Sequence, residues 1–217
     1  MVLIKFIEEL NNLRTLGKSE TLEKLGYKSI EQNNNNHFLY INDTNNSVIA
    51  VVLGFEMEYT DLVLDLINPI NIFNFNENND KFFKILDYLH TRIDEGTEFI
   101  NNIKDKYSNK DLLFLGNSIG GFLINKNLYE TNVKCYTYNS AFFCENIHND
   151  NIVNYRTSGD IVSLGNIFSK YTKTIEVTFI EYLLKNHLDN FIDYTINSHY
   201  LDFLEKYDDK QVEIELP

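Results

Sequence analysis

The sequence is short of several residue types, and it contains no tryptophan, two prolines and two cysteines among 217 residues. Cys135 and Cys144 both fall in or beside a predicted buried strand. Two thiols in such apolar surroundings favour a reducing compartment, although a single local disulfide would also fit the sequence. No linker rich in proline, glycine or serine interrupts the chain, so we expect a single domain over residues 1–217.

Long hydrophobic runs are also missing. No segment approaches the roughly 20 apolar residues that a helix needs to cross a bilayer. Residues 1–9 are apolar for only a few positions and then acidic, without the apolar core and cleavage site of a signal peptide. These features predict a cytoplasmic protein with no integral membrane segment, and they leave room for transient contact with a membrane surface.

Basic residues are scarce: 19 Lys and Arg stand against 32 Asp and Glu, which gives a formal net charge of −13. A phosphate backbone would be repelled on average, so nucleic acid is not an expected partner. Hydrophobic residues make up 43% and charged residues 24% of the chain, as in an ordinary globular protein. The chain should therefore fold around an apolar core. The sequence does not indicate an oligomeric state.

The order of hydrophobic patterns predicts an α/β protein. Residues 37–41 and 47–54 form two apolar segments around the polar turn 43–46, which predicts a pair of strands. Residues 78–107 carry helical spacing, in one long helix or in two helices broken near Gly96. The other predicted elements are helices at 4–16, 120–129 and 189–204 and strands at 111–115, 133–138, 151–155 and 174–179. This order predicts a central, mostly parallel sheet with helices on both faces.

The segment Gly116-Asn117-Ser118-Ile119-Gly120 lies between a predicted strand and a predicted helix. A serine hydroxyl is a weak nucleophile, so catalysis requires a rigid exposed turn, an adjacent base and donors for the developing oxyanion. The G-x-S-x-G pattern supplies such a turn and predicts Ser118 as the nucleophile, with the backbone N–H of Ile119 as an oxyanion donor. The alternative is a glycine-rich turn that only packs a helix on a sheet.

An acid and a histidine follow the serine in this chain order. Asp160 comes just after the predicted strand 151–155, where it is either the catalytic acid or an ordinary turn aspartate. Two histidines follow Asp160. His187 lies on a predicted loop after the last predicted strand, and His199 lies in or between the terminal helices. The loop position favours His187 as the general base, with His199 as the other candidate.

These motifs resemble the class 3 lipase family, the α/β-hydrolases that include fungal triacylglycerol lipases, over roughly residues 48–195. Residues 115–121 resemble the family's G-H-S-L-G-G turn, and residues 156–162 resemble its R-x-x-x-D-x-V acid loop. Further similar segments are residues 61–66, 133–141 and 187–191. The resemblance implies the α/β-hydrolase fold and hydrolysis of a carboxylic ester, with a lipid ester as substrate class. A Ser-Asp-His mechanism of this kind needs no metal and no cofactor.

Two departures from the family pattern stand out. Asn117 replaces the histidine that usually precedes the nucleophile, and it keeps hydrogen-bonding ability. The family's F-R-G-T oxyanion segment corresponds here to about residues 54–57, so Met57 could contribute only its backbone amide to the oxyanion hole, and the Glu56 carboxylate could repel the oxyanion. The competing hypothesis is therefore a hydrolase-like pseudoenzyme that serves as a binding or interaction module. Thioesterase or acyltransferase chemistry on the same triad is a third reading.

Overall fold

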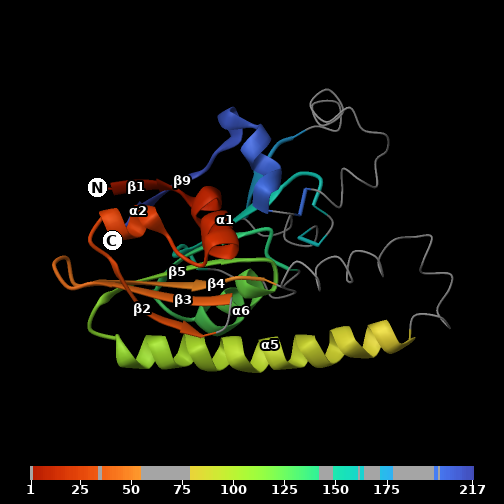
Figure 1. The fold of residues 1–217 in the computed structure, drawn as a ribbon, viewed down its shortest axis with the longest axis horizontal. Helices are drawn as coiled ribbons and strands as arrows, with labels where there is room; N and C mark the ends of the chain where they lie inside the picture. Colours follow the sequence, from red (N-terminus) through yellow and green to blue (C-terminus); the bar gives the residue numbers. More distant parts are fainter. Residues whose placement is uncertain are drawn as a thin grey trace.

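A seven-stranded sheet with strand order β2-β3-β4-β5-β6-β7-β8 forms the centre of the computed structural model (Figure 1). The structure describes residues 2–33, 36–54, 79–141, 149–160, 162–163, 172–177, 198–199 and 201–217. The strands of this sheet are β2 (Lys28–Asn33), β3 (His37–Asn42), β4 (Ser47–Val52), β5 (Asp111–Asn117), β6 (Lys134–Tyr138), β7 (Ile152–Thr157) and β8 (Thr172–Ile175).

The sheet is antiparallel at one edge and parallel over the rest. β3 and β4 form the predicted hairpin, paired in one continuous register from His37 opposite Val52 to Asn42 opposite Ser47. Asn46 in the connecting turn has φ 56°, a left-handed conformation that asparagine tolerates. From β4 to β8 each neighbouring pair is parallel. The mostly parallel central sheet predicted from the sequence is therefore confirmed.

Helices cover both faces of the sheet. α1 (Phe6–Leu16), α2 (Glu20–Lys24) and the 3₁₀ helix η4 (Leu201–Lys206) lie on one side, and α5 (Asn79–Lys106) and α6 (Ser118–Leu128) lie on the other (Figure 1). β4 shows why both faces need cover: Ile49 and Val51 join the cluster under α1, whereas Val48, Ala50 and Val52 join the cluster under α5 and α6. Alternate side chains of a strand point to opposite faces, so this strand, apolar from Val48 to Val52, is buried on both.

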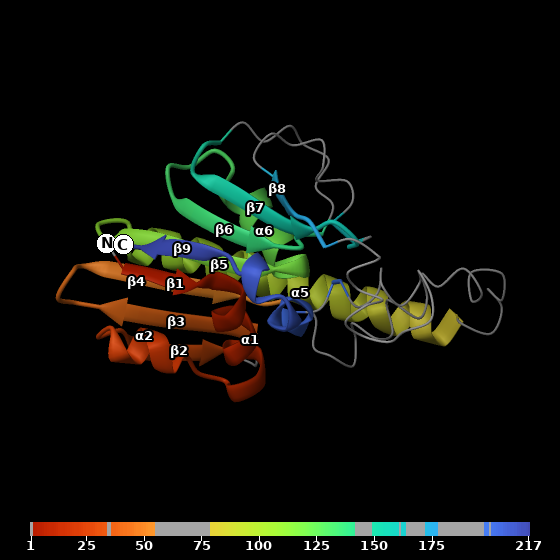
Figure 2. The same ribbon diagram turned by 90° about the horizontal axis from the view of Figure 1, so that it is seen from above.

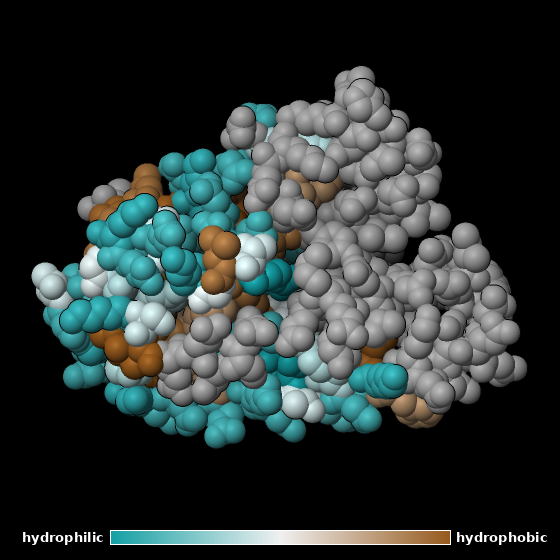
Figure 3. All heavy atoms as spheres, in the orientation of Figure 1, coloured by the Kyte–Doolittle hydropathy of each residue, from teal (hydrophilic) through white to brown (hydrophobic). Residues whose placement is uncertain are grey.

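The segment with helical spacing over residues 78–107 forms one helix, α5, and not two. Gly96 lies within it, and a Cβ atom placed there would stand 2.5 Å from Cδ1 of Leu123 in α6. The glycine therefore serves the close packing of two helices and does not end the helix. The lower edge of the molecule in Figure 3, where α5 lies, is mostly hydrophilic, as expected for an amphipathic helix on a sheet.

Pairing between the two ends of the chain was not predicted. β1 (Val2–Lys5) pairs antiparallel with β9 (Glu213–Leu216) in a separate two-stranded sheet, which places the termini side by side (Figure 2). The first helix consequently begins at Phe6 and not at residue 4. β2 was also not predicted. The described part of the helix expected over 189–204 is 3₁₀ in character, in η4, and the short 3₁₀ helix η5 (Asp208–Lys210) follows it.

Two composition-based expectations can be placed on the fold. Cys135 is a free thiol buried in β6, and burial raises its pKa above the usual range of a cysteine. Cys144 lies outside the described residues. Among the helices that the structure describes, none is both long enough and apolar enough to cross a membrane.

Candidate active site

Ser118 lies where β5 ends and α6 begins, at the carboxyl end of a central parallel strand. Its φ of 52° is in the left-handed region, which costs a residue other than glycine roughly 1–3 kcal/mol. The surrounding structure must hold the serine in this conformation, because a free chain would leave it. A strained serine at a strand-to-helix turn is the geometry predicted from the G-x-S-x-G pattern.

The glycines around Ser118 are required by close contacts. A Cβ atom at Gly120 would lie 2.0 Å from the carbonyl oxygen of Val52, and one at Gly116 would lie 2.9 Å from the same oxygen. A Cβ atom at Gly121 would lie 2.9 Å from Cβ of Ser140, just after β6. The start of α6 thus crosses β4 and β6 at a distance that leaves no room for side chains. Close packing by itself therefore requires these glycines.

Ser118, His199 and Asp160 form a continuous line of contacts. Oγ of Ser118 lies 3.0 Å from Nε2 of His199, and Nδ1 of His199 lies 2.9 Å from Oδ1 of Asp160. All three residues are buried. The partners select one tautomer, because a carboxylate only accepts: the neutral ring donates from Nδ1 to Asp160 and accepts the serine hydroxyl proton at Nε2. This arrangement can transfer a proton from the hydroxyl to the ring.

The carboxylate of Asp160 is fixed in place by its own loop. After β7, the Asp160 amide donates to the carbonyl of Thr157 at 3.1 Å. Its two side-chain oxygens accept from the amides of Val162 and Ser163 at 3.0 and 3.1 Å, and Arg156 donates to its carbonyl at 3.1 Å. Asp160 therefore lies where the sequence predicted the acid, and the buried carboxylate is held by backbone donors as well as by His199.

The histidine of this line is His199, the candidate that the sequence patterns ranked second. Those patterns favour His187, which lies outside the described residues. The ring that contacts both Ser118 and Asp160 belongs to His199. The spacing along the chain carried no signal for this choice, because Asp160 and His199 are 39 residues apart.

Only part of the predicted oxyanion hole lies within the residues that the structure describes. Ile119 is the second residue of α6, in the first turn, where backbone amides have no partner within the helix. Opposite it, Gly54 approaches the nucleophile so closely that a Cβ atom on it would lie 2.6 Å from Cβ of Ser118. Glu56 and Met57 lie outside the described residues. The chain thus enters the predicted oxyanion segment directly beside Ser118.

Asn117 joins this segment to the nucleophile turn. Its buried side chain accepts a hydrogen bond at Oδ1 from the amide of Gly54 at 3.0 Å and from Arg14 of α1 at 3.4 Å. The carbonyl of Leu53 accepts from Arg92 of α5 at 3.2 Å. The peptide between Leu53 and Gly54 is therefore held from both sides. Asn117 thus uses the hydrogen-bonding ability that the sequence indicated.

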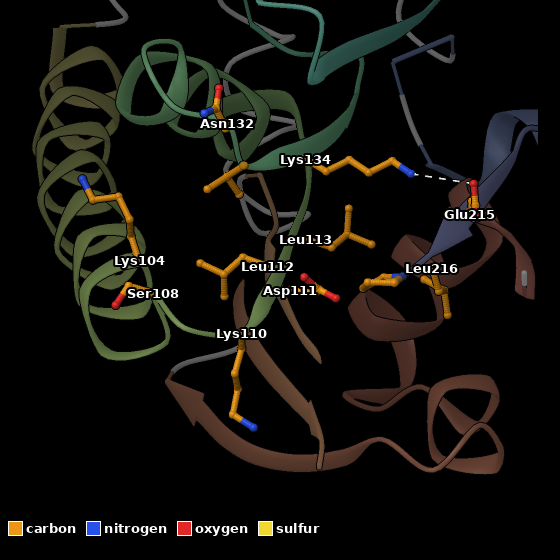
Figure 4. Close-up of a pocket in the computed structure, with 12 residues that line it drawn as sticks. Lys104, Ser108, Lys110, Asp111, Leu112, Leu113, Asn132, Lys134, Glu215 and Leu216 are labelled. Atoms are coloured by element: carbon orange, nitrogen blue, oxygen red, sulfur yellow. Dashed lines mark ion pairs between the residues drawn. The ribbon is translucent and has the colours of Figure 1, made fainter. Parts of the chain in front are cut away.

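A cavity of about 510 Å³, shown in Figure 4, is lined by residues at the start of β5, whereas Ser118 follows the end of this strand. Its lining includes Asp111, the first residue of β5, together with Lys110 and Lys134, and Lys134 forms an ion pair with Glu215 at 4.0 Å. Because β5 separates it from the nucleophile, this cavity is not where a substrate of Ser118 would bind. The described residues contain no group of three or more His, Cys, Asp or Glu side chains placed to hold a metal ion.

Comparison with known proteins gives a likeness in structure alone. No protein-family model and no curated protein matches the chain. The Lip2 lipase of Yarrowia lipolytica is 13% identical, with a TM-score of 0.46 over 78% of this chain and 77% of that one. A Rhizomucor miehei lipase–propeptide complex is 12% identical, with a TM-score of 0.42 over 76% and 60%. A triacylglycerol lipase of Penicillium expansum is 15% identical, with a TM-score of 0.36 over 79% and 76%. Similarity at this level identifies neither a family nor an activity for this chain.

Proposed function

We propose that this protein is a serine hydrolase that cleaves carboxylic esters, with Ser118 as nucleophile, His199 as general base and Asp160 as the residue that orients the imidazole. One observation supports the proposal most: Ser118, at φ 52° on a strand-to-helix turn, contacts His199 at 3.0 Å, and His199 contacts Asp160 at 2.9 Å. A turn that served only for packing would not require a buried histidine and a buried carboxylate in line with its serine.

The reaction would proceed in two halves. Oγ of Ser118 attacks the ester carbonyl while its proton passes to Nε2 of His199, and the Asp160 carboxylate stabilises the imidazolium that forms. The Ile119 amide donates to the oxyanion of the tetrahedral intermediate. His199 then gives the proton to the departing alcohol, which leaves an acyl-serine. Water attacks this ester, again with His199 as base, and the acid product leaves with Ser118 regenerated.

The proposed substrate class is a lipid ester, handled by a cytoplasmic protein in transient contact with a membrane surface. The resemblance of residues 115–121 and 156–162 to lipase motifs supports this class. The proposed chemistry uses no metal and no cofactor. Thioesterase and acyltransferase reactions would use the same first half-reaction, and they differ in the leaving group or in the acceptor that replaces water.

The test compares the wild-type protein with Ser118→Ala on p-nitrophenyl esters of increasing chain length, together with labelling by a fluorophosphonate probe. Ser108→Ala is the matched control, because Ser108 is exposed and lies beside the cavity at the other end of β5. We expect the wild type and Ser108→Ala to hydrolyse the esters and to be labelled, and Ser118→Ala to do neither. Equal rates in the wild type and Ser118→Ala would overturn the proposal. A folded wild type that is neither labelled nor active would support the pseudoenzyme hypothesis.

A further inference from the structure

Asn139 lies one residue beyond β6, next to the nucleophile turn, in an unusual backbone conformation. Its φ is 45°, and its side chain is completely buried. Asparagine tolerates the left-handed region better than other residues with a Cβ atom. The residue takes no part in the proton transfers proposed above. Its position therefore calls for another explanation.

The Asn139 side chain connects the segment that carries Asp160 with the segment that carries His199. Oδ1 accepts from the amide of Thr157 at 2.8 Å, and Nδ2 donates to the carbonyl of Ser198 at 2.8 Å and to that of His199 at 3.5 Å. The carbonyl of Thr157 in turn accepts from the amide of Asp160 at 3.1 Å. One amide group thus lies between the backbones of the acid and the histidine.

The same short segment also contacts the nucleophile. The amide of Ala141, two residues after Asn139, donates to the carbonyl of Ser118 at 3.0 Å. The amide of Asn139 donates to the carbonyl of Tyr155 in β7 at 2.8 Å, which anchors the segment to the sheet. Residues 139–141 are therefore bonded to the chain segments that carry all three members of the line Ser118, His199 and Asp160.

We propose that Asn139 is a positioning residue for this triad, a role that rests on the proposed hydrolase function. Its amide has a donor and an acceptor at a fixed separation, so it sets the distance between the backbone at Thr157 and the backbone at Ser198. Both hydrogen bonds are buried, so the Thr157 amide and the Ser198 carbonyl would be left without a partner if the Asn139 side chain moved away. The loss would lower the stability of the folded protein. A shift of His199 relative to Ser118 changes the rate of proton transfer more than it changes the binding of a substrate, and a misplacement of about 1 Å can reduce the rate roughly 100-fold.

Two substitutions at Asn139 test its hydrogen bonds: one removes the side-chain bonds to both Thr157 and Ser198, and the other changes only the bond to Ser198. Asn139→Gly removes both side-chain hydrogen bonds and keeps a residue that adopts positive φ without strain. Asn139→Asp keeps an acceptor for the Thr157 amide and places an oxygen where Nδ2 now donates to the Ser198 carbonyl. We expect both variants to lower kcat, with KM changed by no more than a few-fold.

Asn149 provides a matched control, because it is a buried asparagine with a similar set of hydrogen bonds at the opposite end of α6 from Ser118. Its Nδ2 donates to the carbonyls of Tyr129 and Thr131 at 2.9 and 2.7 Å, and its Oδ1 accepts from the amide of Asn151 at 2.9 Å. These contacts join the end of α6 to the start of β7. Asn149→Gly should lower the melting temperature as Asn139→Gly does, and it should leave kcat near the wild-type value.

The experiment measures kcat and KM on p-nitrophenyl butyrate and the melting temperature for the wild type and the three variants. We expect kcat to fall about 100-fold in Asn139→Gly and to stay within two- or three-fold in Asn149→Gly. Similar losses of kcat in Asn139→Gly and Asn149→Gly, at similar melting temperatures, would overturn the positioning role. An Asn139→Asp variant with wild-type kcat would also overturn it, and this variant decides the matter if Asn139→Gly fails to fold.

A second readout does not depend on ester hydrolysis. Two-bond ¹H–¹⁵N spectra of the histidine rings, assigned with a His199→Gln variant, report the surroundings of both nitrogens of His199. We expect Asn139→Gly to shift the His199 signals and Asn149→Gly to leave them in place. Shifted signals in a protein that hydrolyses no ester would contradict the proposed function and not the positioning role. Unshifted signals with unchanged kcat in an active enzyme would contradict the positioning role alone.

Discussion

Nδ1 of His199 lies 2.9 Å from Oδ1 of Asp160, and the imidazole reaches Ser118 with its other nitrogen. The Asp160 carboxylate accepts hydrogen bonds from the amides of Val162 and Ser163, so the partner of the imidazole is itself fixed in position. A histidine held in this way has a fixed tautomer and a fixed direction toward the serine.

His199→Ala should abolish most of the esterase activity, while His187→Ala should stay within a few-fold of the wild type. The reason is that His199 makes both contacts that a general base needs. Removing a triad member typically lowers kcat by roughly 10³-fold or more. The measurement is kcat on a p-nitrophenyl ester for both variants at the same enzyme concentration. A large loss in His187→Ala with a mild loss in His199→Ala would reverse the assignment of the base.

Asp160→Asn should lower kcat by roughly 10⁴-fold with little change in the folded structure. The two oxygens of Asp160 now accept from two backbone amides, and an asparagine side chain has one acceptor and one donor. If its amide nitrogen turns toward His199, the ring must hold its proton on Nε2 and can no longer accept one from Ser118.

The matched control for that change is Asp111→Asn, the same chemical substitution at an exposed position at the other end of the sheet. It should retain the wild-type kcat. Asp160→Asn would speak against the triad if it retained activity comparable to that of Asp111→Asn, with the circular dichroism spectra of both variants showing an intact fold.

Gly54→Ala should slow labelling of Ser118 by a fluorophosphonate and lower the free energy of unfolding by about 1–3 kcal/mol. The added methyl would lie 2.6 Å from Cβ of Ser118 and 3.2 Å from the carbonyl oxygen of Asn117, and neither can move without displacing the nucleophile turn. Labelling rates from time-resolved gels and urea denaturation curves measure the two effects.

Gly96→Ala serves as the control, since its added methyl would meet Cδ1 of Leu123 at 2.5 Å, the far end of a flexible side chain that can rotate away. Alanine also favours a helix over glycine by about 1 kcal/mol, which offsets part of the crowding. We expect Gly96→Ala to be labelled at the wild-type rate. Equal labelling rates for Gly54→Ala and the wild type would contradict the prediction that a methyl group at this position displaces Ser118.

His37 should make the stability of the protein depend on pH. Burial, and next the nearby Arg92 guanidinium, lower the pKa of His37 to about 3 from an ordinary value of 6.5. Arg92 donates toward Nε2 of His37 at 3.4 Å, which requires the neutral ring. The unfolded chain binds a proton at His37 below about pH 6.5 and the folded protein does not, so this stabilising contribution is complete above that pH and is lost as the pH falls toward 3.

His37→Gln keeps an acceptor for Arg92 and removes the titration. Its unfolding free energy should therefore fall less steeply than that of the wild type between pH 6.5 and 4, by up to about 1.4 kcal/mol per pH unit. His90→Gln, at an exposed position on α5, should behave as the wild type does. Urea denaturation at several pH values measures the slopes, and parallel curves for His37→Gln and the wild type would contradict the prediction.

The sequence by itself determined the features that depend on neighbouring residues. The hairpin of β3 and β4 follows from two apolar segments on either side of a polar turn, and the helix α5 follows from a period of 3.6 in apolar side chains. The turn at Ser118 could be predicted because the G-x-S-x-G pattern lies between an apolar segment and a helical one. The contact that requires glycine at 116 and 120, the carbonyl oxygen of Val52 in β4, comes from a distant part of the chain. Asp160 could be proposed as the acid because it comes after Ser118 along the chain and just after a predicted strand, in the order expected for such a triad.

The tertiary structure alone decided which distant segments meet. The choice of His199, the link from Asn139 to both Thr157 and Ser198, and the pairing of β1 with β9 all join positions that are separated by long stretches of chain. Four-residue strands such as β1 and β9 carry too few residues to show a period, and a histidine shows no local pattern that distinguishes a base from another buried side chain. Such contacts arise only when the sheet and its helices have fixed the paths of the connecting segments.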